Sequence, residues 1–191
     1  MIPRLVVASK NPDKITEIED LLMPLDLAGE IVGGLEWADI EETGATLQEN
    51  ALIKARAVVE ALGLPALADD TGLEVEALDG APGVKTARFA GPNASYADNV
   101  ARLLDVMDGV EDRSARFRTV VALVMPDGSE VVAPGSVDGV ITTGPRGERG
   151  FGYDPVFEVD GRTLAEMSAE EKHESSHRAR AIRALGDSLG P

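Results

Sequence analysis

The sequence predicts an α/β fold in which a mixed sheet is flanked by helices. In the first half, short apolar runs that indicate strands alternate with longer segments whose apolar residues recur at helical spacing. In the second half, several strand-like runs follow one another with turn-forming residues between them, a pattern typical of hairpins. With 191 residues and 43% hydrophobic content, residues 1–191 suit a single domain, built as one body or as two lobes around a cleft.

The chain opens with a strand, a polar turn and a helix. Leu5–Ala8 is an unbroken apolar run, which suits a strand buried on both faces. Asn11 is a good N-cap, and the proline after it is a good first residue for a helix that a second proline ends. Free N–H groups at this helix start, with Lys10 and Lys14 beside them, would fit a phosphate. Ordinary solvated side chains are the alternative, which is the better interpretation of Lys10 and an equal one for Lys14.

A second helix is predicted after a short strand at Ile31–Val32. Thr46 and Glu49 have the spacing of a capping box, and apolar residues then recur at helical spacing until a glycine and a proline end the helix. Glu42 lies in an acidic loop just before this helix, where a run of solvated charges is the alternative interpretation. Lys54 lies on the flank of the apolar face, a place where the ammonium group usually reaches out to solvent.

Two adjacent carboxylates, Asp69 and Asp70, follow the apolar pair Leu67–Ala68. We expect this pair to end a strand and Gly72 to permit a turn, after which an alternating strand begins. Because side chains alternate along an extended backbone, the two acids should point in opposite directions. One of them is then held by the protein, while the other, which we take to be Asp70, faces a cleft at the carboxyl end of a strand. A plain polar turn is the alternative interpretation.

The second half of the chain predicts another helix, a hairpin and two further strands. The expected segments are a helix capped by Asn93 or Ser95 and reaching Met107, strands at 117–125 and 130–133 around the turn 126–129, and strands at 137–142 and 156–159. A final helix carries apolar residues from Ala179 to Leu189.

The loop 144–155 interrupts this pattern with four glycines and two aromatic residues. Flexible glycines beside Phe151 and Tyr153 suit a lid that closes over a flat ring. A surface loop whose aromatic side chains anchor it to the core is the alternative interpretation.

One rival motif is His173-Glu-Ser-Ser-His177, which matches the H-E-x-x-H zinc pattern. Zinc binding there needs one continuous helix and a third ligand. Ser175 and Ser176 resemble a cap between two helices, and Asp187 would have to serve as the third ligand because the chain has no other histidine. We therefore treat the match as accidental.

Composition excludes several classes of protein. The formal charge of −16 argues against binding a nucleic acid polymer through a basic surface, so a polyanionic ligand must be met by local cations and a metal. The absence of cysteine excludes disulfides and thiolate catalysis. The N-terminus lacks a signal-peptide core, and the longest aliphatic stretch, 120–125, is too short to span a bilayer. We expect a soluble cytoplasmic protein that does not bind membranes.

Taken together, the motifs resemble the inosine triphosphate pyrophosphatase family nearly from end to end. Any one of them is weak evidence, whereas the set in family order is specific. The set comprises Ser9-x-Asn11-x-x-Lys14, Glu42-Thr-Gly44, Glu49-Asn-Ala51 with Lys54-Ala-Arg56, Ala68-Asp-Asp-Thr-Gly72, Gly80-Ala-Pro-Gly83, Ala87-Arg-Phe89, Phe151-Gly-Tyr-Asp-Pro155 and Ser176-His-Arg178.

The resemblance implies an elongated mixed sheet with a central nucleotide-binding cleft, a homodimer and dependence on one or more Mg²⁺ ions per subunit. It implies hydrolysis of the non-standard purine nucleoside triphosphates ITP, dITP and XTP to the monophosphate and pyrophosphate, which keeps them out of DNA and RNA. Asp70 matches the general base and a metal ligand, and Glu42 matches a second metal ligand. Substrate-binding positions are matched by Ser9, Lys10, Asn11, Asp13, Lys14, Lys54, Thr71, Phe151, Gly152, Tyr153, Asp154, Lys172, His177 and Arg178.

Two residues stand outside the family pattern. Lys10 occupies a variable motif position that a small residue often fills, and His173 belongs to no family motif. Asp69 is expected to be structural. Donors near His177 and Arg178 would favour a 6-oxo purine over adenine, because a buried hydrogen bond left unmade costs about 1 to 3 kcal/mol. A pyrophosphatase for other modified or pyrimidine nucleotides and a catalytically silent nucleotide sensor are the alternatives.

Overall fold

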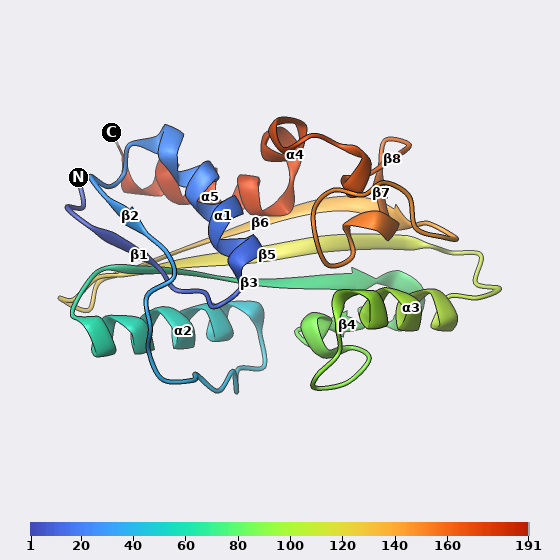
Figure 1. The fold of residues 1–191 in the computed structure, drawn as a ribbon, viewed down its shortest axis with the longest axis horizontal. Coiled ribbons are helices and arrows are strands. Elements are labelled where there is room, and N and C mark those ends of the chain that lie inside the picture. The colour runs from blue at the N-terminus through green and yellow to red at the C-terminus, as the bar shows by residue number, and fades with distance from the viewer. Residues whose placement is uncertain (191) are drawn as a thin grey trace. The chain divides into compact units, whose positions relative to one another are not determined.

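A computed structural model describes residues 1–190 and contains, within that range, one mixed sheet of eight strands flanked by helices (Figure 1). The strand order is β2-β1-β3-β5-β6-β7-β8, with β4 paired to β3. The predicted α/β class is confirmed. The strands are β1 (Leu5–Val7), β2 (Ile31–Val32), β3 (Ala66–Val75), β4 (Pro82–Gly83), β5 (Ser114–Val124), β6 (Glu130–Ile141), β7 (Phe157–Val159) and β8 (Arg162–Thr163).

The helices begin where the capping residues predict. Asn11 accepts hydrogen bonds from the N–H groups of Asp13 and Lys14, and Thr46 forms the predicted capping box with Glu49. Of the two caps considered for the third helix, Ser95 is the one used. Over residues 1–190 the α-helices are α1 (Pro12–Leu22), α2 (Leu47–Leu62), α3 (Tyr96–Val106), α4 (Ala169–Ser175) and α5 (His177–Leu189). None of them combines the length and hydrophobicity needed to cross a bilayer.

The chain divides into two compact units. The first unit contains Met1–Asp70, Thr119–Gly135 and the chain from His177, and the second contains Thr71–Arg118 and Ser136–Ser176. The boundaries fall inside strands β3, β5 and β6, so each of these strands supplies residues to both units.

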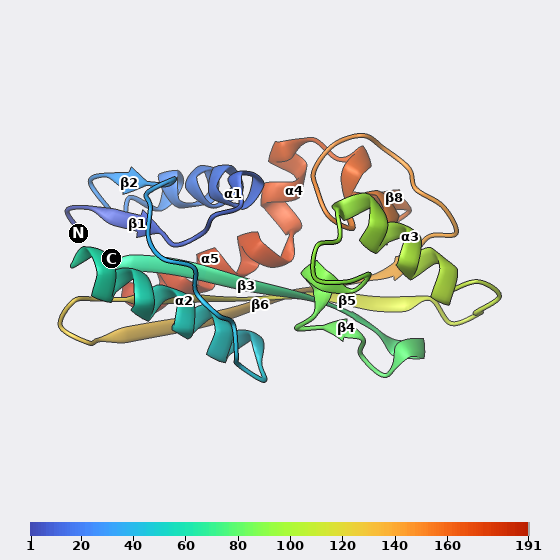
Figure 2. The same ribbon diagram turned by 60° about the horizontal axis from the view of Figure 1, so that its bottom comes forward.

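The first unit places helices on both faces of its strands. Strand β1, which pairs in parallel with β2 and β3, illustrates this arrangement. Its successive side chains point to opposite faces and belong to different hydrophobic clusters. Leu5 and Val7 pack with α1 and α5 through Ile18 and Ile182, whereas Val6 packs with α2. Figures 1 and 2 show α1 and α5 on one side of these strands and α2 on the other. The unbroken apolar run in this strand is therefore explained by burial on both faces.

The second unit has one core, in which α3 packs on strands β3, β5 and β6. Leu103 of α3 and Met107, the residue that ends this helix, belong to the same buried cluster as Val75 and Phe117. Tyr153 lies in the same core with 4% of its surface exposed, and its hydroxyl donates to the carbonyl of Thr86 at 2.9 Å. Burial raises the pKa of this phenol.

The prediction that a strand ends at Ala68 and that the two acids lie in a turn is wrong. Ala66–Val75 is one continuous strand, so Asp69 and Asp70 lie inside it. Gly72 is not among the residues with positive φ, and the antiparallel pairing of Leu73 with Gly83 keeps the backbone extended beyond it. Because both acids lie in one extended strand, their side chains point to opposite faces, as predicted.

The prediction of separate strands at 130–133 and 137–142 is also wrong, because Glu130–Ile141 is a single strand that passes through Pro134 and Gly135. A Cβ placed on Gly135 would lie 2.2 Å from the carbonyl oxygen of His177 and 2.3 Å from the amide nitrogen of Ala181. The glycine therefore marks close contact between the strand and α5 rather than a break in the strand.

The helix break predicted at the two serines is confirmed. The backbone of Ser176 is extended (φ −65°, ψ 159°) and separates α4 from α5. His173 and His177 thus belong to different helices, which removes the continuous helix that the zinc motif needs. Among residues 1–190, no three histidine, aspartate or glutamate side chains are grouped so that they could hold a metal ion.

We predict that Gly135→Ala destabilises the protein by about 1 to 3 kcal/mol, because the added methyl group overlaps the backbone of α5 and one of the two elements must move. Urea unfolding measures the change in the free energy of unfolding. Gly144→Ala is the control, since a Cβ there meets nothing within 4 Å. Equal stability of the two variants would contradict the close packing described.

We predict that Glu171 stabilises the start of α4 down to low pH. Hydrogen bonds from Arg162 (2.8 and 2.9 Å) and from the N–H of Ser168 (2.7 Å) lower the pKa of this carboxyl group from 4.5 to about 2. A pKa lowered on folding means stability that is present above pH 4.5 and is lost as the pH falls toward 2.

The measurement compares the unfolding temperatures of wild type and Glu171→Gln between pH 7 and pH 3. The difference should be largest at pH 7 and shrink below pH 4.5. Glu174→Gln, on an exposed glutamate of the same helix, is the control. A difference that grows on acidification would show that the sign is wrong.

Candidate active site

Asp69 of β3 is held by cations on the face of the first unit that carries α1 and α5. Its side chain is 1% exposed and accepts hydrogen bonds from Lys14 Nζ at 3.2 Å and from Arg178 Nε and Nη2 at 3.1 and 3.0 Å. The buried Arg178 also pairs through Nη1 with Glu17 of α1 at 2.9 Å. We call Lys14, Glu17, Asp69 and Arg178 the Asp69 network.

The pKa values of the Asp69 network follow from burial and mutual attraction. Burial alone would raise the pKa of Asp69, but Lys14 and Arg178 together lower it strongly. Burial alone would lower the pKa of Arg178, but Glu17 and Asp69 raise it. For Lys14 burial prevails, and its pKa is lowered despite Asp69. The acid is therefore charged at neutral pH and tied to two helices, which agrees with the structural role expected for it.

Asp70 points to the opposite face, toward α2. It is 7% exposed, and its Oδ2 accepts a hydrogen bond from Asn50 Nδ2 at 3.3 Å. Its Oδ1 lies 3.2 Å from Lys54 Nζ, and the same ammonium lies 3.4 Å from Oε1 of Glu42. Lys54 therefore turns inward between two carboxylates, and its side chain is only 13% exposed. We call Glu42, Asn50, Lys54 and Asp70 the Asp70 cluster.

Local structure explains how the Asp70 cluster is held. The capping box fixes the first turn of α2, which carries Asn50 and, one turn later, Lys54. Asn50 Oδ1 accepts the N–H of Gly44 at 2.8 Å, and a Cβ on Gly44 would lie 2.6 Å from that oxygen. The loop that carries Glu42 is thus tied to the helix through a glycine, because a larger residue would meet the Asn50 amide.

The pKa values of both Asp70 and Lys54 are raised within the Asp70 cluster. Burial raises the pKa of Asp70, while Lys54 and Lys14 oppose the change and Glu42 adds to it. Burial alone would lower the pKa of Lys54, but Asp70, Asp69 and Glu42 outweigh it and the pKa is raised. A buried carboxyl group whose pKa is raised, beside a fixed cation, is typical of a catalytic acid or base.

Glu42 and Asp70 are suited to hold a magnesium ion. Mg²⁺ prefers oxygen ligands and is usually bound through one or two carboxylates with water and substrate phosphate, rather than by a full protein cage. Both carboxylates reach one shared cation, the Lys54 ammonium, so their oxygens already converge on a single positive charge.

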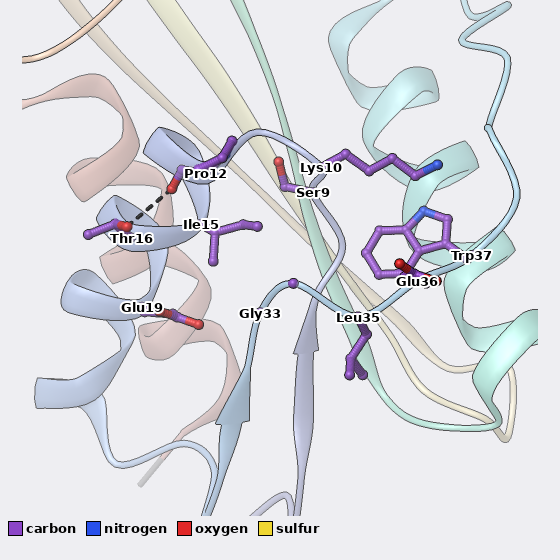
Figure 3. A pocket seen from close by; sticks show the side chains of 11 residues that line it. Ser9, Lys10, Pro12, Ile15, Thr16, Glu19, Gly33, Leu35, Glu36 and Trp37 are labelled. Carbon is purple, nitrogen blue, oxygen red and sulfur yellow. Dashed lines mark hydrogen bonds between the residues drawn. The ribbon is translucent and has the colours of Figure 1, made fainter.

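The turn between β1 and α1 carries further predicted residues. Asn11 caps α1, its own N–H donates to Ser9 Oγ at 3.2 Å, and Asp13 is exposed in the first helical turn. Lys10 is half-exposed and pairs with Asp39, so its ammonium does not belong to the Asp69 network. Ser9 and Lys10 line a pocket of about 650 Å³. In Figure 3, Lys10 lies beside Trp37, across the pocket from Ile15 and Glu19.

The second unit holds the remaining predicted residues. Lys172 is buried, donates to Asp154 Oδ2 at 2.7 Å, and lies 5.0 Å from the centre of the Phe151 ring. The same carboxylate oxygen accepts the N–H of Phe151 at 3.0 Å. The positive φ values of Gly150 (70°) and Gly152 shape this turn. Tyr153 is the core residue described above, and Thr71 follows Asp70 in β3.

The structure therefore forms three groups from the predicted residues. In the first unit, Lys14 and Arg178 share the partner Asp69, and Glu42 and Asp70 share the partner Lys54. His177 is also buried in this unit, at the start of α5. Phe151, Asp154 and Lys172 form the group in the second unit.

Sequence reasoning missed three residues that make contacts in these groups. Asn50 lies within the motif Glu49-Asn-Ala51, so its presence in a motif was a usable signal. Glu17 lies one turn after Lys14 on α1, a spacing that places an acid and a base on the same helix face. Tyr96, which contacts the Phe151 ring, has no signal in the sequence beyond being the first residue of a capped helix.

Comparison with known proteins identifies the family. The model of the Ham1 family matches residues 5–188. The chain is 45% identical over 191 residues to a protein of Streptomyces coelicolor and 47% identical over 193 residues to one of Geobacter sulfurreducens, both named dITP/XTP pyrophosphatase. These alignments cover 95% and 98% of this chain and 94% and 96% of the relatives.

A solved structure agrees with this. The HAM1 protein of Coxiella burnetii has 42% identity and a TM-score of 0.87, and the match covers 98% of each chain. The family resemblance drawn from the motifs is confirmed, and the chain belongs to the Ham1 family.

Proposed function

We propose that this protein is a nucleoside triphosphate pyrophosphatase that hydrolyses dITP, ITP and XTP to the monophosphate and pyrophosphate. The names of its close relatives support the substrate class. The observation that carries the chemistry is the Asp70 cluster, in which a buried acid and Glu42 share the ammonium of Lys54. Removal of these nucleotides from the pool keeps them out of DNA and RNA, and a cytoplasmic location suits that role.

The reaction needs a positioned water and stabilisation of negative charge. The oxygen of the water bonds to the α-phosphorus, and the bond from that phosphorus to the bridging oxygen of the pyrophosphate breaks. Asp70 takes the proton of the attacking water, which its raised pKa favours. Lys54 and Lys14 neutralise charge on the triphosphate, and the N–H groups at the start of α1 add to this.

Glu42 and Asp70 would hold the Mg²⁺ ion, which supplies charge neutralisation at the phosphate oxygens when it is bound. Lys54 pairs with both carboxylates, so the same side chain can turn to a phosphate when the carboxylates are otherwise neutralised. Asp69 stays with Arg178 and fixes the strand from which Asp70 projects.

On the strength of the family resemblance, we assign base binding to Phe151, Asp154 and Lys172 of the second unit. The guanidinium of Arg178 donates to Asp69 and Glu17 through Nε, Nη1 and Nη2, which favours a supporting role for this residue. We also propose a homodimer, on the strength of the family resemblance, and sedimentation equilibrium would test it by giving twice the mass of the chain.

We predict that the purified protein releases pyrophosphate from dITP, ITP and XTP much faster than from dATP, and only with Mg²⁺ present. Excess EDTA should abolish turnover, because two carboxylates facing a triphosphate repel it unless a divalent cation intervenes. Added Mg²⁺ should restore it. Equal rates on dATP, preference for pyrimidine nucleotides, or binding without turnover would each refute the proposed activity.

We predict that Asp70→Asn lowers kcat by about 10² to 10⁴, the usual contribution of a general base. Because burial raises the pKa of Asp70, its charged form is disfavoured in the folded protein, and the neutral amide should leave the unfolding temperature unchanged or higher. Asp138→Asn, on an exposed aspartate of β6, is the control. Turnover close to wild type in Asp70→Asn would exclude this residue as the base.

A further inference from the structure

Tyr96 is an exposed aromatic residue whose position the start of α3 does not explain. It is the first residue of α3, and the cap itself is Ser95, which accepts the N–H of Asp98 at 3.2 Å. The residue is 43% exposed, so burial in the core does not account for its position. The centre of its ring lies 5.8 Å from that of Phe151, with the two planes inclined by 37°.

Phe151 lies between two glycines, Gly150 and Gly152. The glycines on either side of it have φ values of 70° and 65° and offer no side chain that could restrain the ring. Asp154 accepts the Phe151 N–H and also pairs with Lys172, whose ammonium lies near the Phe151 ring. Tyr96 adds contact with the ring itself, from a helix that is fixed by its capping box.

We propose that Tyr96 is a positioning residue for base binding, which acts by holding the Phe151 ring in the orientation that stacks on a purine. The inference rests on the proposed function. Aromatic pairs with centres 4.5 to 7 Å apart contribute about 0.5 to 1.5 kcal/mol beyond burial. A Phe151 ring that is fixed in advance loses less conformational entropy when a flat ring packs on it. Tyr96 therefore strengthens binding without touching the phosphates.

The kinetic signature follows from this geometry. Tyr96→Ala should raise KM for dITP about twofold to tenfold, which corresponds to the free energy of one aromatic pair. The value of kcat should stay within about twofold, because the Asp70 cluster is unaffected. KM for XTP should rise by the same factor, since stacking does not read the edge of the base. Tyr96→Phe should behave as wild type, because the ring is retained.

The experiment measures KM and kcat for wild type, Tyr96→Ala, Tyr96→Phe, Phe151→Leu and the double variant Tyr96→Ala with Phe151→Leu. In the Phe151→Leu background, removal of the tyrosine ring should have no further effect on KM. Val140→Ala is the control, since Val140 is a similarly exposed apolar residue (39%) of the second unit. Thermal unfolding of each variant separates loss of binding from loss of folding.

Several results of this experiment would contradict the proposed role of Tyr96. An unchanged KM in Tyr96→Ala, a KM in Tyr96→Phe as high as in Tyr96→Ala, or an undiminished effect in the Phe151→Leu background would each overturn the role of Tyr96. A fall in unfolding temperature with no change in KM would show a purely structural contact and would overturn it too. If wild type releases no pyrophosphate from dITP, the proposed function fails, and the affinity for inosine monophosphate, measured calorimetrically, then tests Tyr96 by itself.

Discussion

The candidate chemistry in the first unit depends on one constraint, which is that adjacent side chains of an extended strand point to opposite faces. Asp69 and Asp70 are neighbours in β3, yet one is bound by Arg178 and Lys14 and the other faces Lys54. The first acid has a lowered pKa and the second a raised one. Opposite electrostatic environments around two identical residues therefore result from a single backbone geometry, which is the basis for proposing a supporting role for Asp69 and a chemical role for Asp70.

Much of the fold could be predicted because local signals and tertiary packing agree. Asn11, Thr46 and Ser95 each cap a helix by satisfying N–H groups that any helix start leaves unpaired, so their effect does not depend on the rest of the protein. The errors came where distant contacts override local preference. Gly72 suggested a turn and the segment 134–136 was left out of both predicted strands, but pairing with β4 and close packing of Gly135 on α5 keep both segments extended.

The motifs named most residues of the candidate site, but they did not predict which of these residues contact one another. The sequence placed Lys54 among surface lysines, because its position on the flank of a helix cannot reveal that two acids from other segments surround its ammonium. Glu17 was missed for the same reason, since its partner Arg178 is far away in the chain. Tyr96 lies outside every family motif that was recognised. Contacts between residues distant in sequence are set by the packing of whole elements, which single-chain patterns do not encode.

The shared ammonium of Lys54 affects the stability of the folded chain when no ligand is bound. In small zinc proteins the unmetallated chain unfolds, because the free energy of metal binding supplies most of the free energy of folding. Here a lysine from α2 already lies between Glu42 and Asp70 and supplies positive charge from within the chain. The two carboxylates are therefore compensated by a cation of the chain itself, so their mutual repulsion does not oppose folding in the absence of a bound ion.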